Sequence, residues 1–409
     1  MSRPDRDLEH LLRRSTAGVG LEVAATEPHA AQVVWARLPA GRNTLVSGSR
    51  RIALDHDGGP GSIVVDDLTP DAAWSVELHN DRDGVLAVRR FRTPALPRGA
   101  EVFRFATISD LHLGRDRYHA PRNALGVTVP PRLDAEVLPA GRARVTTTGR
   151  AHGTTEDRAT QCARAALDEA IAWGAQLIVV KGDVCEETYD ATWDLAAELL
   201  ADLAVPVMFV PGHHDTGSLR HFEPEQGAAA RGLEVIRGVG HHDVPGLRII
   251  AVDSTVPGSG WGEVARHADE VAEIAAGTDG AAFIATHHQP QRFRVPLYWP
   301  HGIPGPDARR FTRTVGAANA SVLASSGHTH RNRRRRVAGM HWSEVASTSH
   351  FPGVWAGYTV HEGGLHQTVR RIADPEVLAW SEESRRMFGG VWALWAAGEL
   401  GDRCFTLDW

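Results

Sequence analysis

Short apolar runs separated by turn residues fill the first quarter of the chain. The stretches AQVVWARL, SIVVDDL and LAVRRFRT each have the length of one strand, and glycine, aspartate or proline residues lie between such runs. Evenly spaced short strands of this kind are typical of an all-β sandwich. We therefore predict a small β-sandwich domain over residues 1–97, which includes a short helix at 6–14 and ends in a proline-rich linker.

After residue 103 the pattern changes to strands that alternate with helices. Apolar runs of strand length, such as QLIVVK and AAFIAT, are separated by longer stretches with helical spacing of apolar residues. This rhythm favours a largely parallel sheet that helices cover. We predict an α/β domain over residues 103–372. Its expected strands span 176–180, 205–210, 248–252, 281–285 and 321–324, and its expected helices span 157–173, 191–203, 264–276 and 308–318.

Two segments depart from this rhythm. Residues 115–153 are rich in proline and glycine and show little periodicity. Loops of this length in a compact domain are usually functional or mobile, so we interpret the segment as a flap over the site, with a surface insertion as the alternative. Residues 373–409 are expected to form a helical tail. Its apolar residues either dock on the chain's own core or form the contact of a homo-oligomer.

Residues that can bind metal ions follow five predicted strands. Asp110 and His112 end the stretch FRFATISDLHLG, and side chains at i and i+2 of a strand point to the same side. Because ligands of open α/β sheets gather at the carboxyl ends of the strands, we expect all five ends to converge on one crevice. The other ends supply Asp183, His213 with His214 and Asp215, His287 with His288, and His328 with His330.

The donor set of these strand ends indicates more than one metal ion. One histidine after a strand is usually structural, but several buried imidazoles and carboxylates without partners would be costly. Seven nitrogen and oxygen donors without a thiolate suit two ions that share a carboxylate. Imidazole and carboxylate together favour Mn, Fe, Zn or Ni over Ca or Mg.

The motifs DLH, GD, GHHD, THHQP and GHTH, in this order, resemble those of the calcineurin-like metallophosphoesterase family. The resemblance covers residues 103–371 and implies a two-sheet sandwich flanked by helices. The β-rich N-terminal part resembles the fibronectin type III-like domain that precedes the catalytic domain of some metallophosphatases. The expected fold class is therefore α/β, a metallophosphoesterase β-sandwich flanked by helices and preceded by a small all-β sandwich domain.

The resemblance also implies roles for the strand-end residues. Asp183 would bridge two ions, a hydroxide between them would attack phosphorus, and His214 would protonate the leaving group or steady the phosphate, paired with Asp215 or Asp110. The implied ligands of the first ion are Asp110, His112, Asp183 and His330. Those of the second ion are Asp183, His213, a later histidine and His328.

The chain departs from the family pattern in three places. His213 stands where the family has an asparagine ligand, so we expect a second site with altered metal preference. Glu186 stands where purple acid phosphatases carry a tyrosine, so no tyrosine-to-iron charge-transfer ligand is expected. THHQP leaves two histidines for one ligand position: we prefer His287, and His288 is the alternative.

Several neighbouring residues are candidates for contacts with the substrate. An arginine near two metal ions can clamp phosphate, which makes Arg331 a candidate, although most arginines of 331–336 are expected to form a solvated face. Tyr298 and Trp299 either stack on a base or aryl leaving group or are core aromatics. His119, in the predicted flap, and His288 complete the set.

Composition narrows the class of protein. With 409 residues, 42% hydrophobic and 23% charged, the chain has the size for two globular domains, and its formal net charge of −6 gives no general attraction for nucleic acid. The three cysteines are odd in number and widely spaced, which indicates a reducing, cytoplasmic location. We expect no secretory signal and no membrane span.

The expected function is hydrolysis of a small-molecule phosphate ester with two transition-metal ions, Mn, Fe or Zn. We favour phosphodiesters, including cyclic nucleotides, because the resemblance extends to cytosolic relatives that lack the tyrosine ligand. The alternatives are a phosphomonoesterase or nucleotidase, and a binding scaffold of the same fold that has lost catalysis.

Overall fold

The fold is taken from a computed structural model, which describes residues 18–115, 157–216, 224–278, 280–294 and 300–409. Two predicted features fall outside these ranges. They are the helix at 6–14 and nearly all of the flap at 115–153, of which Arg115 alone is described.

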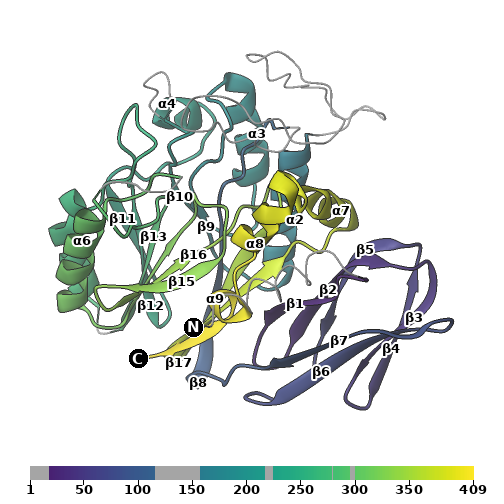
Figure 1. The fold of residues 1–409 in the computed structure, drawn as a ribbon. Helices are drawn as coiled ribbons and strands as arrows, with labels where there is room; N and C mark the ends of the chain where they lie inside the picture. Colours follow the sequence, from purple (N-terminus) through teal and green to yellow (C-terminus); the bar gives the residue numbers. More distant parts are fainter. Residues whose placement is uncertain (1–17, 116–156, 217–223, 279, 295–299) are drawn as a thin grey trace.

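The N-terminal part is a sandwich of two antiparallel sheets, as predicted (Figure 1, purple). Alternating side chains of its strands, such as Val76 and Leu78, are fully buried and pack with Leu45 between the sheets. One sheet has the order β1 (Glu22–Thr26), β2 (Ala31–Leu38) and β5 (Gly59–Val65). The other has the order β4 (Arg50–His56), β3 (Gly41–Ser47), β6 (Ala73–Asn80) and β7 (Gly84–Arg92).

Two further sheets form the α/β part of the chain. The first is parallel along β10, β9 and β8, and antiparallel where β17 joins β8 and β18. Its order is β10 (Val207–Val210), β9 (Ile178–Lys181), β8 (Arg98–Ile108), β17 (Val354–Arg371) and β18 (Phe405–Asp408). The second, parallel from β12 to β16, has the order β11 (Val239–Val244), β12 (Leu247–Val252), β13 (Ala281–Thr286), β14 (Val322–Ser326), β16 (Met340–Glu344) and β15 (Arg333–Val337).

These two sheets pack face to face over a shared apolar core. Phe105 of β8 stacks on Tyr358 of β17 at a ring distance of 4.6 Å and meets Phe283 of β13 edge-on at 4.9 Å. Large aromatic side chains bury much apolar surface, so this contact fixes one sheet against the other. The family-type sandwich expected from the motifs is therefore present.

Helices cover the outer face of each sheet. α2 (Arg158–Ala172) and α3 (Asp190–Leu200) pack on the β8–β9–β10 side, and α5 (Ala268–Ala276) and α6 (Gly305–Ala318) pack on the β12–β13–β14 side. Asp157 caps α2 by accepting the Thr160 N–H at 2.9 Å, a contact worth about 1 kcal/mol. The short elements α4 (Pro224–Ala229) and η1 (Ala265–His267) complete the layer.

The C-terminal segment differs from the predicted helical tail. It contains α7 (Pro375–Ser384), η2 (Met387–Gly390), α8 (Val391–Ala396) and α9 (Leu400–Arg403), but its last residues form β18. The tail prediction was wrong at this point because β17 offers a free edge, and backbone pairing there outweighs the weak local signal of FTLD. Trp392 packs with Phe351 and Met387 of the same chain.

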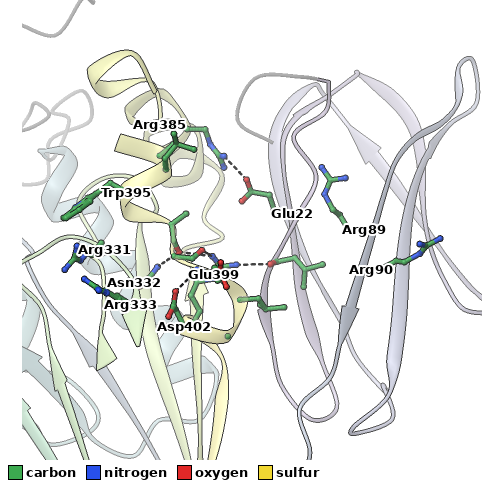
Figure 2. Close-up of a pocket in the computed structure, with 18 residues that line it drawn as sticks. Glu22, Arg89, Arg90, Arg331, Asn332, Arg333, Arg385, Trp395, Glu399 and Asp402 are labelled. Carbon is green, nitrogen blue, oxygen red and sulfur yellow. Dashed lines mark hydrogen bonds and ion pairs between the residues drawn. The ribbon is translucent and has the colours of Figure 1, made fainter. Parts of the chain in front are cut away.

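The C-terminal segment also contacts the N-terminal sandwich (Figure 1, yellow against purple). Gln32 and Arg371 exchange two hydrogen bonds through the Arg371 backbone, at 2.7 and 2.9 Å. Glu22 pairs with Arg385 at 2.8 Å. A cavity of about 710 Å³ lies along this boundary, between β7, α8 and α9 (Figure 2). We propose that the domain boundary lies in the linker that precedes β8, near residue 97.

No helix of the described residues has the length and apolar character needed to cross a membrane.

Candidate metal centre

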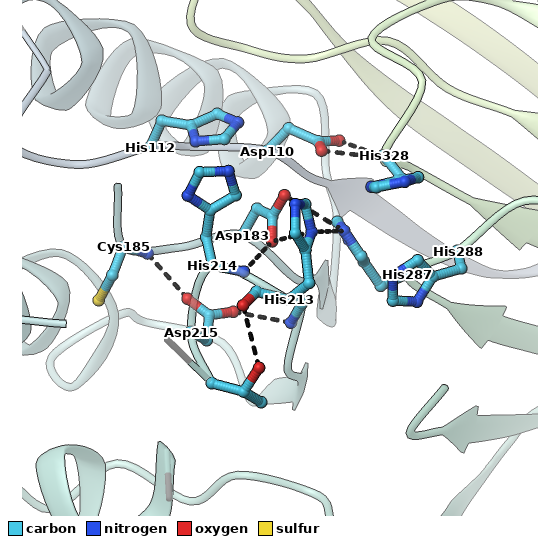
Figure 3. A network of polar contacts seen from close by, with 12 residues as sticks. Asp110, His112, Asp183, Cys185, His213, His214, Asp215, His287, His288 and His328 are labelled. Atoms are coloured by element: carbon cyan, nitrogen blue, oxygen red, sulfur yellow. Dashed lines mark hydrogen bonds and ion pairs between the residues drawn. The ribbon is translucent and has the colours of Figure 1, made fainter. Parts of the chain in front are cut away.

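The strand-end residues predicted to bind metal ions lie together at one end of the two sheets (Figure 3). Asp110 and His112 follow β8, Asp183 follows β9, and His213 follows β10. The second sheet contributes residues after β13 and β14. Four overlapping groups have their ligand atoms within 4.8 Å of one another: Asp110, His112 and His330; His112, Asp183 and His214; Asp110, Asp183 and His287; and His213, His287, His288 and His328.

The backbone at this end of the sheets is unusual. Among the described residues, eight that are not glycine have positive φ, and five of them are candidate ligands. Such left-handed conformations cost roughly 1–3 kcal/mol each and persist where the surroundings enforce them, often at functional sites. The candidate ligands with this conformation are Asp110 (56°), His112 (52°), Asp183 (51°), His328 (66°) and His330 (51°).

The first group of ligand atoms lies between β8 and β14. His330 Nε2 is 3.2 Å from Asp110 Oδ1 and 3.2 Å from His112 Nε2. The Asp110 carboxylate also accepts the His328 backbone N–H at 3.0 Å, which ties the two strand ends together. Asp110 and His112 are buried and His330 is partly buried, and the three donors suit one transition-metal ion.

Asp183 lies between the two halves of the cluster. Its Oδ2 is 3.2 Å from His287 Nε2, its Oδ1 is 3.2 Å from His213 Nδ1, and Oδ1 accepts the His214 backbone N–H at 2.9 Å. Burial favours the neutral carboxyl, yet the His213 and His287 rings hold the pKa of Asp183 well below its usual range. A charged carboxylate with both oxygens facing imidazoles has the placement expected of a bridging ligand.

Hydrogen bonds to backbone carbonyls fix the free nitrogen of two histidines in the second group. Because a carbonyl can only accept, His287 donates Nδ1–H to Lys181 O at 2.8 Å and turns Nε2 toward Asp183. His328 likewise donates Nε2–H to His301 O at 2.8 Å, which leaves Nδ1 with a lone pair. Partners on the second ring nitrogen are typical of histidines that bind metals.

Burial and the nearby Asp183 carboxylate determine the pKa values of these histidines. Burial opposes protonation of His287, but Asp183 outweighs burial and raises the pKa of His287 to about 9. Burial, together with neighbouring rings, holds the pKa of His288 and His328 well below the usual range. Both are therefore neutral imidazoles, the form that binds a metal ion.

His213 points into the second group rather than away from it. Its Nδ1 is 3.4 Å from His287 Nε2, and its ring centre is 4.8 Å from that of His328. An imidazole therefore occupies the position that the family resemblance gives to an asparagine ligand.

His214 lies beside Asp183 and the first group. Its Nδ1 donates to the Glu186 backbone carbonyl at 2.8 Å, and its ring meets His112 edge-on at 4.9 Å. Burial opposes its charge, but Asp183 and Glu186 outweigh this and raise the pKa of His214.

The sequence predicts a pairing of His214 with Asp215 or Asp110, whereas Nδ1 of His214 lies on the Glu186 carbonyl in the structure. Both carboxylate oxygens of Asp215 accept backbone N–H groups, from Cys185 at 2.9 Å and from Gly212 at 2.8 Å. Burial, with Asp183 nearby, raises the pKa of Asp215 to about 7. The Glu186 carbonyl, not Asp215, orients His214, and Asp215 holds the GHHD loop against the end of β9.

Sequence reasoning missed three residues that support the ligands. Glu186 Oε2 lies 2.8 Å from His112 Nδ1, and the same carboxylate binds the Arg115 guanidinium. His350 Nε2 lies 3.0 Å from His330 Nδ1. Arg115 and His350 lie outside the family motifs, and Glu186 stands out in the sequence only because it replaces a tyrosine, which gives no sign of its contact with His112.

The candidates for contacts with the substrate lie in different parts of the structure. Arg331 pairs with Glu344 at 2.8 Å and stacks on Trp395 at 4.1 Å, so it faces the boundary cavity of Figure 2 and not the histidines. His288 lies within the second group of ligand atoms. Tyr298, Trp299 and His119 lie outside the described residues.

The residues present fit two transition-metal ions. Carboxylate and imidazole donors predominate, and no thiolate takes part in the four groups. Two buried ring nitrogens in the second group, His288 Nε2 and His328 Nδ1, have no hydrogen-bond partner among the described residues. Unpaired buried polar atoms cost free energy, and a bound cation would satisfy both lone pairs.

Comparisons with known proteins agree with this chemistry. A family model described as calcineurin-like phosphoesterase matches residues 103–332. No curated protein matches the chain.

The solved structures that the chain resembles are distant. A purple acid phosphatase from yellow lupin (Lupinus luteus) is 12% identical, with a TM-score of 0.44, over 86% of this chain and 72% of that one. The structure of PhoD is 9% identical, with a TM-score of 0.41, over 86% and 87%. The sulfate thiohydrolase SoxB from Thermus thermophilus is 15% identical, with a TM-score of 0.39, over 73% and 61%.

Proposed function

Because the chain belongs to the calcineurin-like phosphoesterase family, we propose that it hydrolyses small phosphodiesters with a dinuclear metal centre. The observation that carries the proposal is the position of Asp183, whose two carboxylate oxygens face imidazoles of two neighbouring groups of ligand atoms. A shared carboxylate is the arrangement that two-metal sites use.

The chain's own residues would hold the two ions. The first would be bound by Asp110, His112, Asp183 and His330, and the second by Asp183, His213, His287 and His328. Two ions act as Lewis acids toward phosphoryl oxygens and lower the pKa of water. Glu186 and His350 would keep the first-site imidazoles in the required tautomer and orientation.

His214 would supply the proton for the leaving group. Its Nδ1 is fixed on the Glu186 carbonyl, so Nε2 carries the proton that can be transferred. The raised pKa of His214 favours the protonated ring before reaction. An alkoxide leaving group needs such a donor, and general acids contribute about 10²–10⁴-fold to rate.

The charge of the site favours a diester over a monoester. A monoester dianion gains from an additional arginine that clamps its oxygens. Among the described residues, Arg115 lies beside the candidate ligand His112 and is bound by Glu186, and Arg331 is bound by Glu344 and faces the boundary cavity. Glu186 stands in place of the tyrosine of purple acid phosphatases. This also favours a diester, because the family resemblance extends to cytosolic relatives that lack the tyrosine ligand. The three buried free cysteines fit the cytoplasmic location that we propose with this function.

A substrate screen tests the proposal. Metal-free protein is loaded in turn with Mn, Fe, Zn and Ni and assayed on bis(p-nitrophenyl) phosphate, p-nitrophenyl phosphate and 3′,5′-cyclic nucleotides. We expect faster turnover of the diesters. Faster turnover of p-nitrophenyl phosphate would instead identify a phosphomonoesterase or nucleotidase. Protein that holds both ions but hydrolyses none of these esters would support the scaffold alternative.

A further inference from the structure

The histidine that follows His287 has the surroundings of a ligand rather than of a core residue. His288 is fully buried, and its ring centre lies 4.7 Å from that of His287 and 4.6 Å from that of His328. Its ligand atom lies within 4.8 Å of those of His213, His287 and His328. Two nitrogens bound to one ion at about 2.1 Å are about 3–4 Å apart, so a small approach of the four side chains would let them share an ion.

The hydrogen bonds of His288 leave one nitrogen facing this group. Nδ1 is 2.8 Å from Ser254 Oγ, an oxygen that also accepts the His288 backbone N–H at 3.2 Å. Nε2 is buried and has no hydrogen-bond partner among the described residues. With Nδ1–H donated to Ser254, Nε2 carries a free lone pair, whereas the other tautomer would bury an N–H group with no acceptor, which is costly.

The loop after β12 holds the ring in this position. A Cβ atom on Gly262 would lie 2.4 Å from His288 Cβ and 2.6 Å from Cγ, so the glycine backbone packs directly against the imidazole. Thr255 pairs with Gly262 across the loop, which keeps Ser254 and Gly262 on the same ring. Fixed by these contacts, His288 cannot turn away from the cluster without a shift of the backbone.

We propose that His288 is a fourth imidazole ligand of the second metal ion, in addition to His213, His287 and His328. The inference rests on the proposed dinuclear centre and deepens it. A site with four imidazoles and the Asp183 carboxylate is richer in nitrogen than the set implied by the family motifs. Imidazole suits Zn, Fe, Ni and Cu, whereas oxygen ligands suit Mn and Mg. The second site should therefore prefer Zn or Ni to Mn.

Cobalt binding tests the assignment without an activity assay. Metal-free wild-type protein, His288→Ala, Ser254→Ala and the exposed-residue control His241→Ala are titrated with Co²⁺, and the visible absorption of the ion reports its ligands. We expect two binding events in wild type and in His241→Ala. In His288→Ala we expect binding of the second Co²⁺ ion to weaken at least tenfold and its absorption spectrum to change. Binding of the first ion should persist. Added free imidazole should restore binding of the second ion. Ser254→Ala, which removes only the partner of Nδ1, should weaken the second event about tenfold.

The outcomes separate a failure of the His288 assignment from a failure of the proposed dinuclear centre. If wild type binds two ions, and His288→Ala leaves the second affinity and spectrum unchanged, His288 is a substrate contact or a core residue and this inference is overturned. If wild type itself binds clearly fewer than two ions, the proposed dinuclear function fails first. Should His288→Ala not fold, Ser254→Ala decides, because unchanged affinity in that variant would also contradict ligation by Nε2.

Discussion

The Oε2 atom of Glu186 lies 2.8 Å from Nδ1 of His112, so a carboxylate orients the imidazole that leaves the end of β8. Arg115 binds the same carboxylate oxygen, and its Nη2 lies 3.1 Å from His112 Nδ1. Carboxylate partners of this kind fix the tautomer of a metal-binding histidine and raise its basicity. Glu186 therefore acts on the proposed first ion through His112.

Glu186→Gln should weaken binding of the first ion. The substitution keeps the size of the side chain but removes the charge that orients His112, and changes of such partners cost about 10–100-fold in metal affinity. Competition with a chromophoric chelator measures the affinity. The neighbouring exposed Glu187→Gln serves as the matched control and should bind both ions normally. Equal affinities in both variants would remove Glu186 from this role.

His214→Ala should lower turnover while leaving the metal content intact. We expect a loss of about 10²–10⁴-fold, the usual contribution of a general acid. The loss should be larger for a 3′,5′-cyclic nucleotide than for bis(p-nitrophenyl) phosphate, because an alkoxide needs a proton more than a nitrophenolate does. A loss of equal size on both substrates would argue that His214 binds phosphate and does not donate a proton.

His213→Asn should change the metal preference of the second site. The variant replaces an imidazole by the carboxamide that the family pattern has at this position, and oxygen ligands suit Mn better than Zn or Ni. We expect the ratio of Zn to Mn affinity to fall about tenfold or more. Unchanged preference in parallel titrations with both metals would mean that His213 is not a ligand.

His366 should make the boundary with the N-terminal sandwich sensitive to acid. Its Nε2 lies 3.1 Å from Thr26 O, its Nδ1 lies 3.2 Å from Thr406 Oγ1, and burial lowers its pKa from 6.5 to about 4. Between these pH values the unfolded chain binds the proton and the folded chain does not. Stability is therefore retained above pH 6.5 and falls as the pH drops toward 4, by about 3 kcal/mol for this group.

Thermal or urea unfolding between pH 7 and pH 4 measures this effect. His366→Gln keeps a polar side chain that does not titrate, so its stability should depend less on pH in this range than that of wild type. The exposed His242→Gln should behave as wild type. If His366→Gln and wild type lose stability in parallel, His366 does not carry the dependence.

Much of the fold and the site could be predicted from the sequence, because both depend on local signals. Alternating apolar residues in β6 and buried runs such as β13 report strands directly, and carboxyl ends of parallel strands meet at one edge. Asp110, Asp183 and His328 could therefore be placed at one centre before their distances were known. The place of the GHTH motif directly after β14 could be predicted for the same reason.

The rest depends on contacts between distant parts of the chain. Glu186 and His350 reach His112 and His330 only through the three-dimensional fold. Arg331 is a candidate for a phosphate contact, but Glu344 and Trp395 hold its side chain at the boundary cavity. The left-handed backbone of the ligands also has no clear sequence signal, since aspartate and histidine are enriched at positive φ but adopt it in only a small minority of positions.

Counting the metal ions in the purified protein decides whether the centre is dinuclear. Elemental analysis of wild-type protein, after dialysis against buffer with a stoichiometric mixture of Mn, Fe, Zn and Ni, should give about two transition-metal ions per chain. Clearly fewer than two ions per chain would contradict the dinuclear account.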